Sequence, residues 1–214
     1  MTLFHWICLG AFLVCTTACL YHFIRTLAAG MPPDMARRNG RVGAAIVYSF
    51  TGAMSPLKKE TAYLHLPTYT AGLIYHMGTF LSFTLLVLLF AGFHIPGRAA
   101  YVLAALLAVS SAAGLSVLLK RIIKAPLRHL SHADDYLSNV LVTLFHFLTA
   151  LTLLKTSLLP ILLLYGSLLF LYIPVGKLRH TVYFFTSRIH LGIFNGRRGV
   201  WPVRKGGYDD RNAG

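Results

Sequence analysis

The sequence predicts an all-α membrane protein, a bundle of five transmembrane helices with its N-terminus outside and its C-terminus in the cytoplasm. The chain has 214 residues, of which 56% are hydrophobic and only 12% are charged, a balance that is not typical of a soluble domain of this size. Its hydrophobic residues form five long runs that contain no Asp, Glu, Lys or Arg. Almost all lysines and arginines lie between alternate runs, which indicates a fixed orientation across a membrane.

The five runs cover residues 3–24, 66–92, 99–119, 136–154 and 156–176. Each is long enough to cross about 30 Å of hydrocarbon as a helix. The third run is diluted by alanine, glycine and serine, but small residues let a helix pack closely, so we expect this helix at the centre of the bundle. The first run follows no basic segment typical of a cleavable signal, so we expect it to be retained as a helix.

The basic residues determine the predicted orientation. Of the 20 lysines and arginines, only Arg98 and Lys155 lie on one side of the predicted membrane, and the others lie in the first loop, in the third loop and after the fifth run. Because basic loops stay in the cytoplasm, this asymmetry places the N-terminus outside. Topology and contact with anionic lipid explain the net charge of +14, which therefore does not indicate a nucleic-acid partner.

Two segments outside the spans also have an apolar pattern. Residues 42–50 are apolar enough to lie in the membrane interface or against a partner. Residues 178–194 keep a helical apolar period and predict an amphipathic extension. Residues 1–194 are thus expected to form one membrane domain, followed by a cytoplasmic tail, residues 195–214, that only a partner would order.

Three cysteines, Cys8, Cys15 and Cys19, lie in the first run at spacings that put them on one helix face. No histidine or carboxylate accompanies them, so we expect small packing residues rather than metal ligands. The sequence has no Cys-x-x-Cys-His motif, which excludes covalently attached c-type haem.

Two histidines lie deep inside the predicted spans. His76 stands ten residues into the second run, and His146 stands eleven residues after Asp135, near the cytoplasmic start of the fourth. At 1.5 Å per residue, both lie roughly 15 Å deep. A ring nitrogen in hydrocarbon needs a partner, which makes each a candidate for proton transfer or metal ligation. One such histidine could simply form a hydrogen bond to a neighbouring helix, but two at matched depth favour the two axial ligands of a b-type haem.

A second pair of histidines lies closer to the predicted cytoplasmic surface. His65 precedes His76 by eleven residues, almost three helical turns, so both lie on nearly the same helix face. His180 follows the fifth run at a similar level, and His65 and His180 are candidates to hold a second haem. A solvated role is the alternative, since polar residues are well tolerated at the interface.

Polar residues at the cytoplasmic ends of the third and fourth runs are candidates for quinone binding and proton exchange. They are His132, Asp134, Asp135 and Lys120. The simpler alternative is that these residues anchor the helix ends.

Three short segments carry a further signal. They are Tyr75-His76-Met77-Gly78, Ala133-Asp134-Asp135 and Pro174-Val175-Gly176-Lys177-Leu178-Arg179-His180. Together with the five-helix plan, these segments resemble the gamma subunit of respiratory nitrate reductase. The run Ser55-Pro56-Leu57-Lys58-Lys59-Glu60 is similar to a branch of that superfamily, the cytochrome b subunits paired with heterodisulfide-reductase-like iron–sulfur proteins.

The resemblance implies a set of haem ligands. In the nitrate reductase subunit, histidines matching His76 and His180 hold the haem nearer the cytoplasm. The positions matching the ligands of the distal haem are Leu86 and Leu162 in this chain. Their joint replacement implies that the family's distal haem is absent and leaves His146 for a rearranged site. The family pattern therefore pairs His76 with His180, whereas depth pairs it with His146, and both schemes stay open.

The expected function is that of a membrane cytochrome b subunit of a respiratory complex. With one or two haem b groups, it would carry electrons between quinone, as exchangeable substrate, and the iron–sulfur clusters of a heterodisulfide-reductase-like subunit on the cytoplasmic side. The resemblance implies the cytoplasmic membrane of a bacterium or archaeon. The alternative is a haem-free transporter or assembly protein that uses its buried histidines, although such proteins favour charged or broken helices at the midplane, and no predicted span contains an acidic residue.

Overall fold

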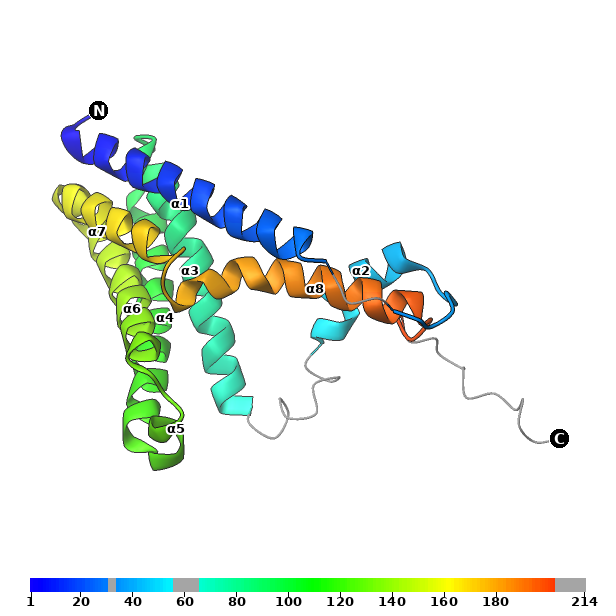
Figure 1. Ribbon diagram of the computed structural model, residues 1–214. Helices are drawn as coiled ribbons and strands as arrows, with labels where there is room; N and C mark the ends of the chain where they lie inside the picture. The colour runs from blue at the N-terminus through cyan, green and yellow to red at the C-terminus, as the bar shows by residue number, and fades with distance from the viewer. Residues whose placement is uncertain (31–33, 56–65, 203–214) are drawn as a thin grey trace. The chain divides into compact units, whose positions relative to one another are not determined.

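The computed structural model describes residues 1–30, 34–55 and 66–202, and these residues form helices joined by short turns, with no strand among them (Figure 1). The chain divides into two compact units. The first unit comprises Met1–Leu20 and His65–Arg179, and the second comprises Tyr21–Leu64 and His180–Gly214. The expectation that residues 1–194 form one membrane domain stays a prediction.

In the part of the chain that the structure describes, four helices are long and apolar enough to cross a membrane. They are α1 (Leu3–Ala28), α3 (Leu66–Phe90), α4 (Gly97–Ile123) and α6 (Ala133–Leu154). These helices confirm the first four predicted spans to within a few residues at either end. The multi-pass all-α membrane class follows from them.

The fifth predicted span is interrupted. A one-turn helix, Thr156–Leu158, leads into α7 (Leu159–Tyr172), whose 14 residues cover only about 21 Å. Pro174 has no amide hydrogen and therefore cannot continue the helical hydrogen bonds, which accounts for the end of α7. After the turn Lys177–Arg179 the chain continues as α8 (His180–Arg197), and the pair is long enough for a fifth crossing only if it counts as one broken span.

The first unit is built around α4. This helix packs along both α3 and α6, as its small residues predict, and Ala104, Ser110 and Gly114 are buried in these contacts. A larger apolar core joins α3 and α6 to α7 and to the first part of α1. In that core the ring of Phe83 lies 5.0 Å from that of Phe145 and 5.7 Å from that of Phe170. Short helix α5 (Ala125–His129) follows α4 and precedes α6 (Figure 1).

The cysteines of α1 lie in this core. Cys8 and Cys15 are buried and Cys19 is partly buried against the same apolar cluster. Their positions confirm the expected packing role on one face of the helix.

The second unit is held together by α2 (Val42–Phe50) and α8, which pack against each other. Gly192 and Gly196, one turn apart on α8, let the two backbones approach, since a β-carbon at Gly192 would lie 2.5 Å from the Cα of Ile46. The buried hydroxyl of Ser49 donates a 2.8 Å hydrogen bond to the carbonyl of Arg188. The apolar segment at residues 42–50 is therefore covered by α8.

Residues 195–202 are ordered by contacts within the second unit. The amide of Asn39 donates a 2.7 Å hydrogen bond to the carbonyl of Arg197, and the ring of Trp201 lies 5.6 Å from that of Tyr48. Arg198 forms an ion pair with Asp34 at 3.2 Å. This part of the predicted tail is thus held by the chain itself.

Candidate functional site

His146 lies at the centre of the first unit and is fully buried. Its Nδ1 atom lies 3.1 Å from the hydroxyl of Ser110 on α4, and its Nε2 atom lies 3.0 Å from the hydroxyl of Thr79 on α3. One imidazole from α6 therefore binds both neighbouring helices. We call the group formed by Tyr75, Thr79, Ser110, Thr143 and His146 the histidine cluster.

Two glycines let the helices approach closely enough for these contacts. A β-carbon at Gly78 would overlap the side chain of Ser110 and lie 3.4 Å from Cε1 of His146. A β-carbon at Gly114 would overlap the ring of Tyr75. No side chain larger than hydrogen fits at either position without a shift, so the space around the cluster is filled by protein.

Tyr75 closes the cluster on one side. Its ring centroid lies 5.0 Å from that of His146, and its hydroxyl donates a 2.9 Å hydrogen bond to the carbonyl of Asn139. The same hydroxyl lies 3.3 Å from that of Thr143. Every side-chain polar atom of the cluster thus has a hydrogen-bond partner, as groups in an apolar interior require.

The hydrogen bonds favour one tautomer of His146. The hydroxyl of Thr79 already donates to the carbonyl of Tyr75 at 2.9 Å, so it accepts from Nε2–H of the imidazole. Nδ1 of a neutral ring must then accept. The hydroxyl of Ser110 lies 3.1 Å from both Nδ1 and the carbonyl of Ile74, and in this tautomer its one hydrogen is donated to Nδ1. This assignment satisfies a neutral imidazole in a medium where a charge would be costly.

His76 lies at the same level as His146 but on another face of α3. The matched depth expected from the sequence is observed, because Tyr75 and Thr79, on either side of His76 along the helix, both contact His146. Successive residues of an α-helix are turned by about 100°, which directs His76 away from the cluster. Its side chain lies on the exposed surface of the helix.

The two imidazoles therefore do not face one another across an open space. Axial ligation by His146 needs one ring nitrogen directed at iron, and each of its nitrogens is occupied by a hydroxyl. The surroundings of His146 do not fit a porphyrin, since Gly78 and Gly114 leave no room for one there. The imidazole of His76, by contrast, lies on an open helix face, since a β-carbon at Gly72, one turn before it, would meet nothing within 4 Å.

The positions that match the family's distal ligands lie in the apolar core. Leu86 and Leu162 are both buried in the cluster that joins α3, α6 and α7. A methyl group of Leu86 would lie 2.9 Å from a β-carbon at Gly166, so leucine side chains occupy the space next to that glycine. No room for a second porphyrin is left at this level.

The other two ligand candidates are placed differently. His180 is the first residue of α8 and belongs to the second unit, where its side chain is exposed. His65 lies outside the described residues. Its pairing with His180, and that of His180 with His76, stay predictions.

The four candidates for quinone and proton exchange are engaged in local contacts. Asp135 is buried and pairs with Lys177 and, at 3.4 Å, with Arg121. It also accepts a 2.9 Å hydrogen bond from the amide of His132, the residue that caps α6. Asp134 accepts from the hydroxyl of Tyr172, and Lys120 donates to the hydroxyl of Thr68. All four residues thus lie in contacts near helix ends, and both a part in quinone binding or proton exchange and the simpler anchoring role stay predictions.

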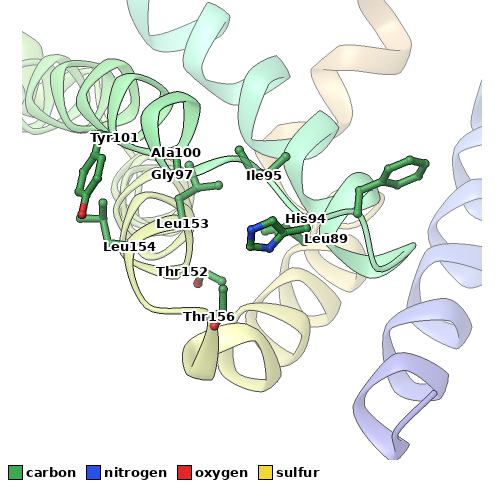
Figure 2. A pocket seen from close by; sticks show the side chains of 11 residues that line it. Leu89, His94, Ile95, Gly97, Ala100, Tyr101, Thr152, Leu153, Leu154 and Thr156 are labelled. Atoms are coloured by element: carbon green, nitrogen blue, oxygen red, sulfur yellow. The ribbon is translucent and has the colours of Figure 1, made fainter.

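A small pocket lies at the opposite ends of the same helices. It has a volume of about 250 Å³, and Figure 2 shows the ring of His94 on one wall, with Thr152 and Thr156 of the α6 end on another. Leucines and Tyr101 complete an otherwise apolar lining. No pattern in the sequence predicted this hollow.

The sequence also did not single out the hydroxyl members of the histidine cluster. The signal was present, because Tyr75 and Thr79 are four residues apart on one face of α3 and Ser110 lies in the small-residue stretch of α4. Among the described residues, no group of three His, Cys, Asp or Glu side chains is arranged to hold a metal ion. In comparisons with known proteins, the chain matches no family model, no curated protein and no solved structure.

Proposed function

We propose that the chain is the haem-binding membrane subunit of a respiratory complex and transfers electrons between the quinone pool and an iron–sulfur partner. The observation that carries the proposal is the position of His76. Its imidazole lies ten residues into a 25-residue span, on an exposed face that is otherwise apolar, where Leu73, Met77 and Phe80 are each more than half exposed. An ionisable side chain at mid-depth on such a face is rare and typically functional, and ligation of haem iron is one of the established roles of histidine at this depth.

The proposed cofactor content is one haem b per chain, with His76 as an axial ligand. The resemblance to the nitrate reductase gamma subunit supplies His180 as the second ligand. The occupied nitrogens of His146 and the buried leucines at positions 86 and 162 support this single-haem scheme over a two-haem scheme. When bound, the haem supplies one-electron chemistry. The chain contributes the ligand, the apolar surface around it and, at Gly72, space for a flat group.

The partner and the orientation follow from charge. Eighteen of the 20 lysines and arginines lie on one predicted side, which supports a cytoplasmic C-terminus and a basic surface for an iron–sulfur subunit there. Protease added to sealed right-side-out vesicles should leave the C-terminal region uncut. Cleavage of that region in intact vesicles would overturn this orientation.

The haem proposal is tested by counting haem. A pyridine haemochrome assay of the purified chain should give one haem b per polypeptide, and His76→Ala should remove it. His94→Ala, which changes an exposed histidine of the turn between α3 and α4, is the matched control and should retain all of it. Full haem content and an unchanged reduced spectrum in His76→Ala would end the proposal.

A second candidate is the haem-free membrane protein. One observation favours it: the histidine cluster forms a hydrogen-bonded group inside the bundle, with a neutral imidazole that is able to accept or give a proton. A folded native chain that shows no absorption band of b-type haem after expression with haem supplied would establish this class instead.

A further inference from the structure

A basic pocket lies in the first unit where α4 ends and α5 begins. It has a volume of about 550 Å³. Lys120, Arg121 and Lys124 supply its charged wall, and Val117, Leu127 and Leu130 supply an apolar wall. None of the lining residues is acidic. The pocket therefore combines positive charge with a surface suited to hydrocarbon.

The positive charge is only partly neutralised. Arg121 forms an ion pair with Asp135 at 3.4 Å and donates to the hydroxyl of Ser131 at 3.1 Å, but Asp135 is shared with Lys177. Lys120 donates to the neutral hydroxyl of Thr68. The ammonium group of Lys124 has no side-chain partner in the described part of the chain. The carboxylate of Asp135 is thus shared by Arg121 and Lys177. Neither Lys120 nor Lys124 forms an ion pair with a carboxylate in the described part of the chain.

The apolar wall is open to the outside. Leu127 is 38% exposed and Leu130 is 78% exposed, although both follow directly from a membrane-spanning helix. Leucines at such a level lie against the acyl region of the bilayer. The ligand of this pocket must therefore carry negative charge at one end and hydrocarbon at the other.

We propose that the pocket binds one anionic membrane phospholipid, with its phosphate held by Lys120 and Lys124 and an acyl chain along Leu127 and Leu130. Basic pockets between membrane helices on the cytoplasmic side are suited to such headgroups. The proposal does not depend on haem, since none of these residues is a haem-ligand candidate.

Native mass spectrometry of the purified full chain in detergent tests the proposal. The chain is titrated with dioleoylphosphatidylglycerol, and with dioleoylphosphatidylcholine as the headgroup without net charge. Phosphatidylglycerol should bind more tightly, and Lys120→Gln/Lys124→Gln should weaken it about thirtyfold, which corresponds to about 1 kcal/mol per lysine. Equal affinity of the native chain for both lipids would overturn the proposal.

The matched control is Arg37→Gln/Arg38→Gln, which removes the same charge from exposed positions in the second unit. It should change phosphatidylglycerol affinity less than twofold. An equal loss in the control and in the pocket variant would show that general surface charge binds the lipid. Displacement of the lipid by millimolar inorganic phosphate would assign the pocket to free phosphate and would also overturn the proposal.

Two further variants separate lipid binding from folding. Lys120→Arg/Lys124→Arg keeps both charges and should bind phosphatidylglycerol as the native chain does. Lys124→Gln alone changes an exposed side chain, so its fold should be retained, and the affinity should fall about fivefold. Unchanged affinity in Lys124→Gln would count against the proposal.

Discussion

Nε2 of His146 lies 3.0 Å from the hydroxyl of Thr79, and this contact joins α6 to α3 inside the apolar part of the first unit. The other nitrogen of the same ring joins α6 to α4 through Ser110. A single side chain therefore links three helices, which explains a buried histidine without assigning it to a metal.

Replacing His146 should affect stability rather than haem content. His146→Ala removes a buried ring and two hydrogen bonds. Thr79 keeps its bond to the carbonyl of Tyr75, and the hydroxyl of Ser110, released from Nδ1, is 3.1 Å from the carbonyl of Ile74 and donates to it instead. We expect a loss of about 1–3 kcal/mol in the free energy of unfolding, measured by thermal or denaturant unfolding in detergent. The proposed single haem should remain. Loss of haem from this folded variant would restore His146 as a ligand.

Position 78 should not tolerate a side chain unless the neighbouring residue, Ser110, is replaced by a smaller one. In Gly78→Ala the new methyl group overlaps the side chain of Ser110, and we expect overpacking to cost about 1–3 kcal/mol. The double variant Gly78→Ala/Ser110→Gly should recover part of this loss, because it removes the overlapping atoms. Gly10→Ala in α1 meets nothing within 4 Å and is the control. Equal stability of Gly78→Ala and the native chain would contradict this packing.

The contact of α2 with α8 should depend on glycine. Gly192→Val places its side chain against the backbone of Ile46 and should separate the two helices. Hydrogen exchange measured by mass spectrometry should then become faster across residues 42–50. Gly43→Ala lies on α2 itself, where a β-carbon meets nothing within 4 Å, and should leave exchange unchanged. Slow exchange in Gly192→Val would mean that this glycine is not required.

The second unit should loosen in acid. The amide of Ala36 and the guanidinium of Arg198 both donate to the carboxylate of Asp34 and hold its pKa below the usual range. A lowered folded-state pKa contributes stability that is present above the unfolded pKa of about 3.9 and is lost as the pH falls through the folded value. Protection across residues 34–50, measured as the exchange rate relative to the intrinsic rate at the same pH, should therefore fall below about pH 4. Asp34→Asn should lack this fall in protection, and the same pH profile in that variant would assign it to another group.

The depth of the histidines in the membrane could be predicted from the sequence, but the direction in which each side chain points could not. The rise of a helix is constant, so counting from Leu66 placed His76 at the level of His146. Rotation of α3 about its axis depends on which residues of α4 it meets. That contact depends on the close packing of Gly78 against Ser110. A fit between two small residues leaves no hydrophobic period in the sequence from which it could be predicted.

The long apolar helices were predictable because hydrocarbon thickness sets their length. The break after Tyr172 was harder to predict, because residues 156–176 contain no charge and are long enough for a continuous span. The sequence did not distinguish a membrane interface from a partner as the surface that residues 42–50 contact, because an apolar pattern does not identify what covers the segment. The structure identifies α8 as the covering element, which contacts residues 42–50 through Gly192 and Gly196.

The hydrogen bond from Ser49 to Arg188 spans 139 positions of the chain, and this separation has a consequence for biogenesis. Synthesis proceeds from the N-terminus, so α2 leaves the ribosome long before α8 exists. During that interval the buried side of α2, with Ala45 and Ser49, lacks the cover that α8 later provides. The second unit is therefore the last part of the molecule to assemble. A chain stopped before residue 192 should carry an uncovered apolar helix, a feature that membrane proteases and chaperones recognise.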